Sequence, residues 1–481
     1  MSSIKIFWKN SAIYGISSIM VRSISFLLLP LYTNSFSKDE TGYIFLIFTF
    51  IAFAQVVYHC GIDSAFLQYY KDNASDKDSV GRTVIISLIL TSIIFSSLII
   101  FFSDKISIYF LGIENGIWFQ YCGWILLFDA ISSRMMMLIR IQERTIIFLI
   151  ISIINVISTI LASYFLVVSY KMGINGILIG TLIGSILKWL MLSPALIFTI
   201  SRGVFSFSII LKLLKFGLPF FPAAIFYLLL ELSDRFILFW ILGPESVGIY
   251  SVGYKIGSLA LFIITAFNLG WQPFYIKHGN NANAGNIFGN IGTIFIHFLI
   301  IIWGLITFWT PVLMRIKMGN NYLIGQEFWA SEQVVSIIFF SYLFYAGYIV
   351  LMPSIYLLEK QNWSPIFRGT AALLNIILNC IFITYWGLIG AAFSTLISYL
   401  VMFLFIYYKS NKWIKIYCNW NGISKHLLIT SIFILCYFFM QKTLLISISV
   451  TLIYLGILFV IRGKMKIYND YKYIKSSFKD A

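Results

Sequence analysis

The stretch LLKFGLPFFPAAIFYLLLELSDRFILFWIL (residues 213–242) decides the class of fold. It is long and apolar enough to cross a bilayer, yet it holds Glu231, Asp234 and Arg235 far from either end. The whole chain has the same character: 60% of its 481 residues are hydrophobic, 11% are charged, and the mean hydropathy is +0.91. A soluble domain carries about a quarter charged residues. The sequence therefore predicts an all-α polytopic membrane protein.

Apolar runs of transmembrane length recur along the chain. A membrane-spanning helix needs about 20 apolar residues, and fourteen stretches meet this requirement. They cover residues 9–34, 42–70, 83–103, 116–139, 145–170, 173–200, 213–242, 246–276, 288–314, 333–358, 363–385, 387–408, 425–441 and 443–461.

Lysine and arginine set the orientation of these helices. With the N-terminus in the cytoplasm, 23 of the 34 basic residues fall in or next to inside segments, six in outside segments and five at hydrocarbon depth. Such an asymmetry is typical of an inside-positive membrane protein with an even number of helices. Both termini are expected in the cytoplasm. The net charge of +16 is explained by topology, so no nucleic-acid partner is required.

Nine charged residues within the apolar runs are placed at hydrocarbon depth. Each costs roughly 2.5 to 3.5 kcal/mol at the centre of a lipid-facing helix, so we expect them to face one another or an internal aqueous cavity. A charged cavity at membrane depth favours a path for a polar or ionic substrate. The cations, candidate contacts along that path, are Arg22, Arg134, Lys188, Arg235 and Lys255, and the acids, candidates for pairing or ion coupling, are Asp63, Asp129, Glu231 and Asp234.

Sequence spacing offers structural alternatives for several of these charges. Glu231 and Arg235 are four residues apart with the acid first, so they could pair along one helix. For Arg235 and Asp234, ion pairing and substrate contact both stay open. Asp129 and Arg134 are five residues apart and point about 140° away from each other, so each should find its partner on another helix.

The remaining cations have no acid nearby on their own helices. This favours exposure of Arg22 and Lys255 to a cavity. Lys188 could contact the substrate or extend its ammonium group to the interface.

A polar stripe follows one face of the second predicted helix. Gln55, His59 and Asp63 are spaced four residues apart, as in a possible proton relay, because histidine titrates near physiological pH. Hydrogen bonding between helices is the alternative interpretation.

Helix-breaking residues crowd the start of residues 213–242. Gly217, Pro219 and Pro222 add backbone freedom and remove hydrogen-bond donors. They predict a kink, which serves either gating or packing alone.

The two halves of the chain resemble each other. The turn Ser37–Ile44 is similar to Gly243–Tyr250, and Gly173–Gly176 is similar to Gly387–Gly390, at offsets of about 206 and 214 residues. An offset of six helices predicts two parallel-related bundles around a central cavity. We therefore expect an N-terminal bundle (1–200), a cytoplasmic linker (201–212), a C-terminal bundle (213–408), and two additional helices with a basic tail (409–481).

No cofactor or metal site is expected. The five cysteines are scattered and mostly helical, and the four histidines lack the spacing of metal ligands.

Several motifs, in order along the chain, resemble one known family. They are Leu29–Thr33, Asp39–Tyr43, Gly61–Ala65, Phe216–Pro219, Leu232–Leu238, Gly248–Val252 and Tyr254–Lys255. They are similar to the polysaccharide (Wzx-type, O-antigen) flippases of the multidrug/oligosaccharidyl-lipid/polysaccharide (MOP) superfamily. The resemblance implies two helix bundles that move an undecaprenyl-pyrophosphate-linked oligosaccharide, of the O-antigen, capsule or lipopolysaccharide type, to the periplasmic leaflet of the bacterial inner membrane. It also implies coupling to an ion gradient, and membrane lipids and other polysaccharide assembly proteins as partners.

Other functions stay open at this point. A drug exporter or a peptidoglycan lipid II flippase of the same superfamily would share these features. A membrane polysaccharide polymerase or ligase is disfavoured, because the longest outside loop, Arg315–Glu332, has only about 18 residues and no catalytic motif appears on any loop. We therefore expect a transporter and not an enzyme.

Overall fold

The computed structural model describes residues 20, 23–59, 61–62, 65–66, 69–70, 76–218, 221–281 and 283–461. The chain divides into two compact units, Met1–Phe236 and Ile237–Ala481, which we describe one at a time. The predicted domain boundaries at 200, 212 and 408 stay predictions.

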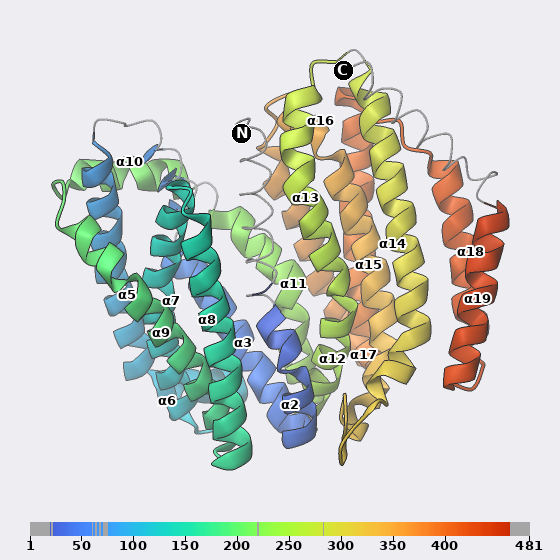
Figure 1. Cartoon of the computed structure of the whole chain (residues 1–481), viewed down its shortest axis with the longest axis horizontal. Helices are drawn as coiled ribbons and strands as arrows, with labels where there is room; N and C mark the ends of the chain where they lie inside the picture. The colour runs from blue at the N-terminus through green and yellow to red at the C-terminus, as the bar shows by residue number, and fades with distance from the viewer. Residues whose placement is uncertain are drawn as a thin grey trace. The chain divides into compact units, whose positions relative to one another are not determined.

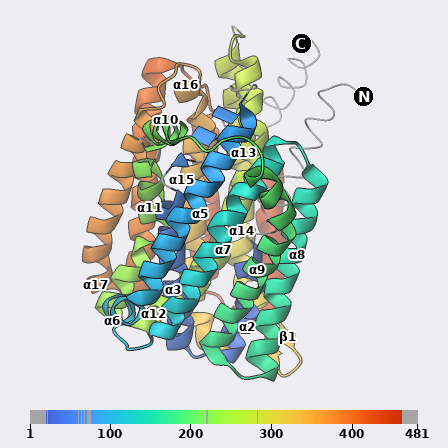
Figure 2. The ribbon, with the colours of Figure 1, turned by 90° about the vertical axis from the view of Figure 1, so that its left-hand side faces the viewer.

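The first unit is a bundle of long helices (Figures 1 and 2). Helix α7 packs against both α5 and α9, α8 packs against α9, and α10 lies across the end of α5. The elements are α2 (Leu29–Ser35), α3 (Lys38–His59), α5 (Lys77–Phe101), α6 (Ser103–Leu111), α7 (Gly116–Ile141), α8 (Thr145–Tyr164), the π-helix η1 (Phe165–Ser169), α9 (Gly173–Ile200), α10 (Phe207–Gly217) and α11 (Phe221–Leu242), whose last turns enter the second unit.

Glycines bring α8 and α9 into close contact. Gly180 and Gly184 lie one turn apart on α9, and a Cβ atom at Gly184 would stand 2.0 Å from the hydroxyl oxygen of Thr159. Asn155 on α8 donates a hydrogen bond of 3.0 Å to the carbonyl of Gly184. Small residues one turn apart are the usual means of close helix packing where lipid supplies no hydrophobic drive.

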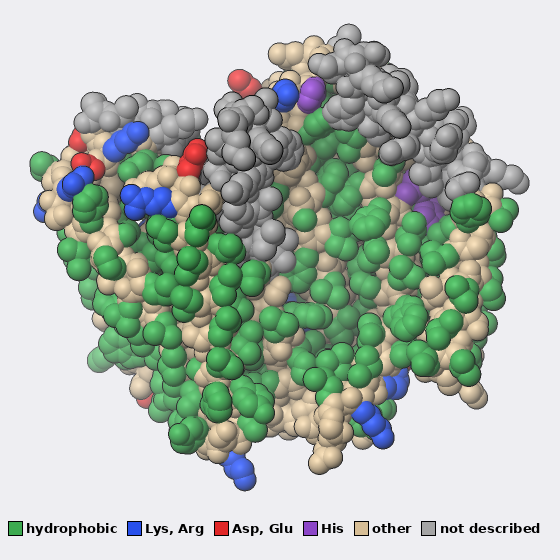
Figure 3. Space-filling view, in the orientation of Figure 1, with side chains coloured by type: hydrophobic (Ala, Val, Ile, Leu, Met, Phe, Trp, Pro, Cys, Tyr) green, Lys and Arg blue, Asp and Glu red, His purple; other side chains and the backbone are tan. Residues whose placement is uncertain are grey.

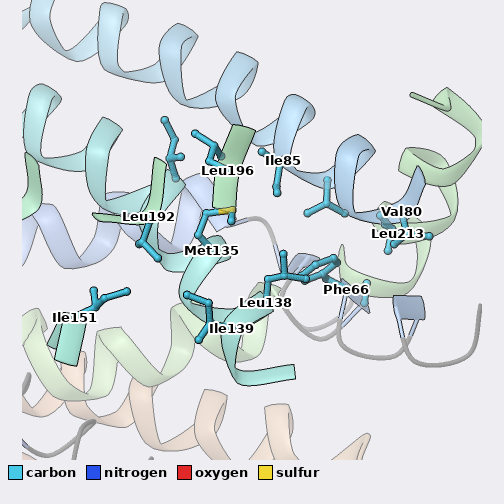
Figure 4. Packing of buried hydrophobic residues seen from close by; sticks show 13 residues of the cluster. Phe66, Val80, Ile85, Met135, Leu138, Ile139, Ile151, Leu192, Leu196 and Leu213 are labelled. Atoms are coloured by element: carbon cyan, nitrogen blue, oxygen red, sulfur yellow. The ribbon is translucent and has the colours of Figure 1, made fainter. Parts of the chain in front are cut away.

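A hydrophobic cluster fixes the end of this bundle that carries α10 (Figure 4). Val80 and Ile85 from α5 meet Met135 from α7 and Leu196 from α9, while Leu213 brings in α10. Burying such side chains contributes about 1.5 to 3 kcal/mol each. The amphipathic α10 is thus held to the bundle by its apolar side.

The second unit holds the remaining elements. Helix α15 packs against α12, α14 and α17, and α18 and α19 pack against α14. The elements are α12 (Pro244–Gly257), α13 (Leu259–His278), α14 (Ala284–Met314), the antiparallel hairpin β1 (Lys317–Met318) and β2 (Asn321–Tyr322), the 3₁₀-helix η3 (Gln326–Ser331), α15 (Glu332–Leu351), α16 (Pro353–Tyr356), α17 (Trp363–Trp413), α18 (Trp420–Phe438) and α19 (Leu444–Ile461).

Helix α17 consists of two membrane spans joined at Gly387. This residue has φ 56° and ψ −131°, a conformation open to glycine alone. At 51 residues α17 is far longer than one bilayer crossing requires. The break falls between the predicted helices 363–385 and 387–408, so the sequence placed both arms correctly.

The predicted multi-pass membrane fold is confirmed. In the described part of the chain, ten helices are long and apolar enough to cross a membrane, or eleven if α10 and α11 form one bent span. Division of α17 at Gly387 adds one span to this count, and the shorter α19 adds another. With the first predicted helix, of which the structure describes only part, the number of spans is roughly consistent with the fourteen predicted helices. Figure 3 shows the matching surface: hydrophobic side chains cover the middle, while lysine, arginine and acidic side chains lie mainly near the helix ends.

The second predicted helix is interrupted at Gly61, and the described residues 62, 65–66 and 69–70 beyond it are again helical. The sequence indicated one helix over 42–70, but α3 ends at His59 and Gly61 adopts a left-handed conformation with φ 69°. Close packing explains the interruption, because a Cβ atom at Gly61 would lie 2.2 Å from the carbonyl oxygen of Gly217.

Candidate substrate and ion site

An ion pair joins α7 and α9 at membrane depth in the first unit. Nζ of Lys188 lies 2.5 Å from Oδ1 of Asp129, and both side chains keep a little under a fifth of their surface exposed. Asp129 thus finds its partner on another helix, as its direction on α7 predicted. The pair is accessible enough to open, and an ammonium group released from Asp129 could bind a phosphate oxygen.

One turn further along α7, buried polar groups connect to the end of α3. Nη2 of Arg134 donates a 3.2 Å hydrogen bond to the carbonyl of His59, and the arginine is only 1% exposed. The hydroxyl of Ser133 lies 3.4 Å from Nε2 of His59. The last carbonyls of a helix lack intrahelical donors, so Arg134 satisfies the C-terminus of α3. Its guanidinium is therefore held in a fixed position between helices.

A second charged cluster lies on α11. Nη1 of Arg235 is 3.1 Å from Oδ1 of Asp234 and donates a 2.9 Å hydrogen bond to the backbone carbonyl of Glu231. The backbone amide of Arg235 also donates to the Asp234 carboxylate. All three residues are buried. The guanidinium of Arg235 thus contacts the Asp234 carboxylate and the Glu231 backbone, and its pairing with the Glu231 side chain four residues earlier stays a prediction.

The opposite face of α11 lines an apolar hollow within the first unit. Ile225, Leu229 and Phe236 lie on one face of the helix, whereas the charged cluster lies roughly 160° to 260° around it. The hollow has a volume of about 530 Å³, and almost all of its lining is apolar. The other lining residues come from α3, α5 and α6: Phe50, Phe53, Ala54, Val57, Tyr58, Phe95, Leu98, Ile99 and Phe110. The sequence did not predict this hollow, because its lining residues do not differ from those of any other apolar helix.

Lys255 and the predicted helix break lie in other parts of the fold. Lys255 is partly buried in the last turn of α12, in the second unit. Gly217 ends α10 and Pro222 is the second residue of α11, where a missing amide hydrogen costs little. The helices on either side of this break are bent by 49°, as the predicted kink requires. Gating stays a prediction.

Arg22, Asp63 and Pro219 lie outside the described residues, so the Gln55–His59–Asp63 relay can be followed only to His59. The role of each charge as a substrate contact or coupling site stays a prediction. Among the residues that the structure describes, no group of three or more potential metal ligands occurs.

Sequence reasoning missed one polar group entirely. His297 on α14 and His426 on α18 are buried and lie against each other in the second unit. They are 129 residues apart, and no spacing rule links them.

Comparison with known proteins agrees with this fold. Residues 36–268 match a family model described as "Polysaccharide biosynthesis protein". No curated protein is a significant sequence match to the chain.

Solved structures of three transporters share the fold. The structure of lipid II flippase MurJ in an inward closed conformation is 20% identical, with a TM-score of 0.71, and the alignment covers 95% of this chain and 99% of that one. An inward-facing multidrug resistance MATE family transporter is 11% identical, with a TM-score of 0.62 and coverage of 84% and 95%. The Vibrio cholerae MATE transporter VcmN in its bent form is 11% identical, with a TM-score of 0.56 and coverage of 89% and 98%.

These neighbours are a flippase and two transporters. Together, the family match and the shared fold confirm the predicted resemblance of this chain to the polysaccharide flippases of the MOP superfamily.

Proposed function

We propose that this protein is a flippase that moves lipid-linked oligosaccharide repeat units from the cytoplasmic to the periplasmic leaflet of a bacterial inner membrane. The cargo is an undecaprenyl-pyrophosphate-linked glycan of the O-antigen or capsule type. Alternating access between two bundles, driven by an ion gradient, is the mechanism. The observation that carries the proposal is the family match over residues 36–268, because this segment contains Arg134, Lys188, Arg235 and Lys255.

The chemistry of the first unit supports a cargo with a charged head and an apolar tail. A pyrophosphate carries about two negative charges, and guanidinium and ammonium groups are its natural protein partners. Lys188 is the best-placed described cation, since its partial exposure lets it exchange Asp129 for phosphate. Arg134 is buried and held by the end of α3, so we assign it a positioning role on the path.

The apolar hollow supports the same cargo. It lies in the same unit as the ion pair and is separated from the α11 charges only by the thickness of that helix. Each buried methylene contributes about 0.8 kcal/mol, so even a short section of an isoprenoid chain would bind usefully there. The glycan and the pyrophosphate would remain on the charged side.

The decisive experiment compares substrates in proteoliposomes. Purified full-length protein is reconstituted with fluorescent undecaprenyl-pyrophosphate oligosaccharide, with lipid II, or with a cationic dye. Translocation of the oligosaccharide lipid, and neither of the others, is the expected result. Transport of lipid II alone would replace the proposal with a peptidoglycan function, and transport of the dye alone would replace it with drug export.

A variant series tests the cationic path. Lys188→Ala should reduce oligosaccharide flipping by about tenfold or more, the loss expected for one charge-assisted hydrogen bond, and Lys188→Glu should reduce it further. The matched control is Lys105→Ala, which removes an exposed cation near the outer end of the same unit. Arg22→Ala and Lys255→Ala test the other two candidates at equal protein level. Unchanged flipping in the Lys188, Arg22 and Lys255 variants would remove this set of cations from the path.

A further inference from the structure

Two histidines form an isolated polar contact inside the second unit. Nδ1 of His297 lies 2.8 Å from Nδ1 of His426, and the rings stack at 5.0 Å with an angle of 26° between their planes. The exposed fractions are 2% and 1%. The contact joins the middle of α14 to the second turn of α18.

The distance between the two Nδ1 atoms restricts the proton positions. A neutral imidazole has one donor nitrogen and one acceptor nitrogen. A hydrogen bond between two Nδ1 atoms therefore requires a proton on one Nδ1 and none on the other. The two rings must adopt opposite tautomers, and a single proton lies between them.

The outer nitrogens of the pair differ from each other. Nε2 of His426 lies 3.4 Å from the hydroxyl of Tyr454 on α19, which in turn lies 3.0 Å from the hydroxyl of Thr430. Nε2 of His297 is buried. The chain of hydrogen bonds thus ends at Nε2 of His297, which has no hydrogen-bond partner among the described residues.

We propose that His297 and His426 form a proton-binding site that takes up one proton at Nε2 of His297. In the receptive tautomer, His297 donates its Nδ1 proton to His426 and leaves Nε2 as a free acceptor. Protonation there produces an imidazolium that keeps its hydrogen bond, now charge-assisted. A second proton would make both Nδ1 atoms donors and break the contact. The pair therefore has a capacity of one proton.

The surrounding helices supply no counter-charge close to the pair. Helices α13, α14, α18 and α19 contain no aspartate or glutamate, and Glu332 on α15 pairs with Arg315 and Lys442. Arg315 follows the end of α14, about 27 Å along the helix from His297 by a rise of 1.5 Å per residue. The other titratable groups on these elements and on the segment before α18 are Tyr275, Lys277, His278, Tyr342, Tyr345, Tyr348, Lys415, Tyr417, Cys418, Lys425, Cys436, Tyr437 and Tyr454.

Proton uptake should therefore be linked to movement of α18 relative to α14. A buried charge without a counter-ion is costly, so the protonated state favours access of water to the pair. Water would enter along the contact between α14 and α18, beside the 2.9 Å hydrogen bond from the backbone amide of Asn419 to Thr293, while the hydrogen bond between the two Nδ1 atoms persists. This proposal does not depend on the identity of the transported lipid.

Nitrogen NMR of the full-length protein in nanodiscs tests the site directly, because the chain has only four histidines. With ¹⁵N-histidine label, His297 and His426 should show opposite tautomers at about pH 8 and a scalar coupling between their Nδ1 atoms. On stepwise acidification, Nε2 of His297 should gain a proton while the coupling persists. Two identical tautomers without coupling, or no protonation of His297, would overturn the proposal.

A proton count provides the second test. His297→Asn combined with His426→Gln replaces both imidazoles by amides that form hydrogen bonds but cannot bind the proton, so proton uptake over the same pH range should fall by about one proton per chain. The control is His278→Asn in the last turn of α13, which leaves the pair intact. If this double variant folds as the wild type does and its proton uptake is undiminished, the site lies elsewhere. If this variant does not fold, Tyr454→Phe replaces it. Protonation of His297 as in the wild type, together with the coupling between the two Nδ1 atoms, would then sustain the proposal. Loss of the His297 protonation in Tyr454→Phe would overturn it.

Discussion

The two units bury polar side chains in different ways. In the first unit, Arg134, Glu231, Asp234 and Arg235 are buried as charged groups. In the second, no described lysine, arginine, aspartate or glutamate is buried to that degree, and the buried polar side chains are neutral histidine, asparagine, serine and threonine. Removal of one charge from a buried pair leaves the other charge uncompensated, whereas removal of a buried neutral polar group costs less free energy of unfolding. The first unit should therefore be far more sensitive to single polar substitutions.

Truncation of Arg235 gives the largest expected effect. Arg235→Ala leaves the Asp234 carboxylate buried at 1% exposure without its guanidinium partner. Breaking a buried pair in this way costs about 3 to 5 kcal/mol. The matched change in the second unit is Asn379→Ala, which removes the 2.9 Å hydrogen bond to Asn375 and should cost about 1 to 3 kcal/mol. Unfolding of the full chain in detergent, followed by circular dichroism, measures both.

A double variant checks the reason for this difference. Asp234→Leu combined with Arg235→Met removes both charges and should recover most of the stability lost in Arg235→Ala. If the double variant is as unstable as the single one, packing and not charge determines the sensitivity of the first unit.

The glycine contact between residues 61 and 217 gives the next largest effect. Gly61→Ala incurs about 1 to 2 kcal/mol for a positive φ and about 1 to 3 kcal/mol for crowding against the Gly217 carbonyl. Gly112→Ala is the matched control, because Gly112 has nearly the same φ, 67°, but nothing within 4 Å of its added Cβ. Thermal unfolding of the two variants isolates the crowding. Equal losses of stability would mean that the close approach adds nothing.

The fold could be predicted from the sequence because each membrane span is a local property. Hydropathy located the helices on both sides of Gly387, and the glycine and prolines around residue 219 predicted the break between α10 and α11. The end of α3 at His59 was not predictable, since it depends on contact with Gly217, which lies far away in sequence.

The candidate site was only partly predictable for the same reason. Charged residues stand out in an apolar chain, so Asp129, Lys188 and Arg134 were recognised, and helical geometry indicated that Asp129 and Arg134 have partners on other helices. The identity of those partners is tertiary information. A few scattered histidines give no pattern that indicates which of them meet in the fold, so nothing in the sequence linked His297 to His426.

A charge exchange at the α7–α9 pair should have a moderate effect on stability. Lys188→Asp combined with Asp129→Lys keeps the ion pair, so the double variant should unfold within about 1 to 2 kcal/mol of the wild type. Flipping should nevertheless fall about tenfold or more, because the cation moves from α9 to α7. Proteoliposome flipping and thermal unfolding, measured on the same preparation, separate the two roles. Normal flipping with the exchanged charges would show that the position of the cation is unimportant.

The smallest effect is expected for the ion pairs at the outer end of the second unit. Glu332 contacts both Arg315 and Lys442, whose side chains are 31% and 25% exposed. The Glu332 side chain itself is 12% exposed, so these are partly exposed pairs at the periphery, each worth up to about 1 kcal/mol and screened by salt over about 8 Å at physiological ionic strength. Glu332→Gln should therefore cost no more than about 1 kcal/mol at low salt and almost nothing at about 1 M salt.

The salt dependence of unfolding then separates the two kinds of charge. The difference in stability between the wild type and Arg235→Ala should change little with salt, because the α11 cluster is screened only weakly by ions that cannot reach it. Glu332→Gln should converge on the wild type as salt is added. If both variants respond alike, the α11 cluster is reached by solvent ions, and the contrast between buried charge in one unit and peripheral charge in the other no longer holds.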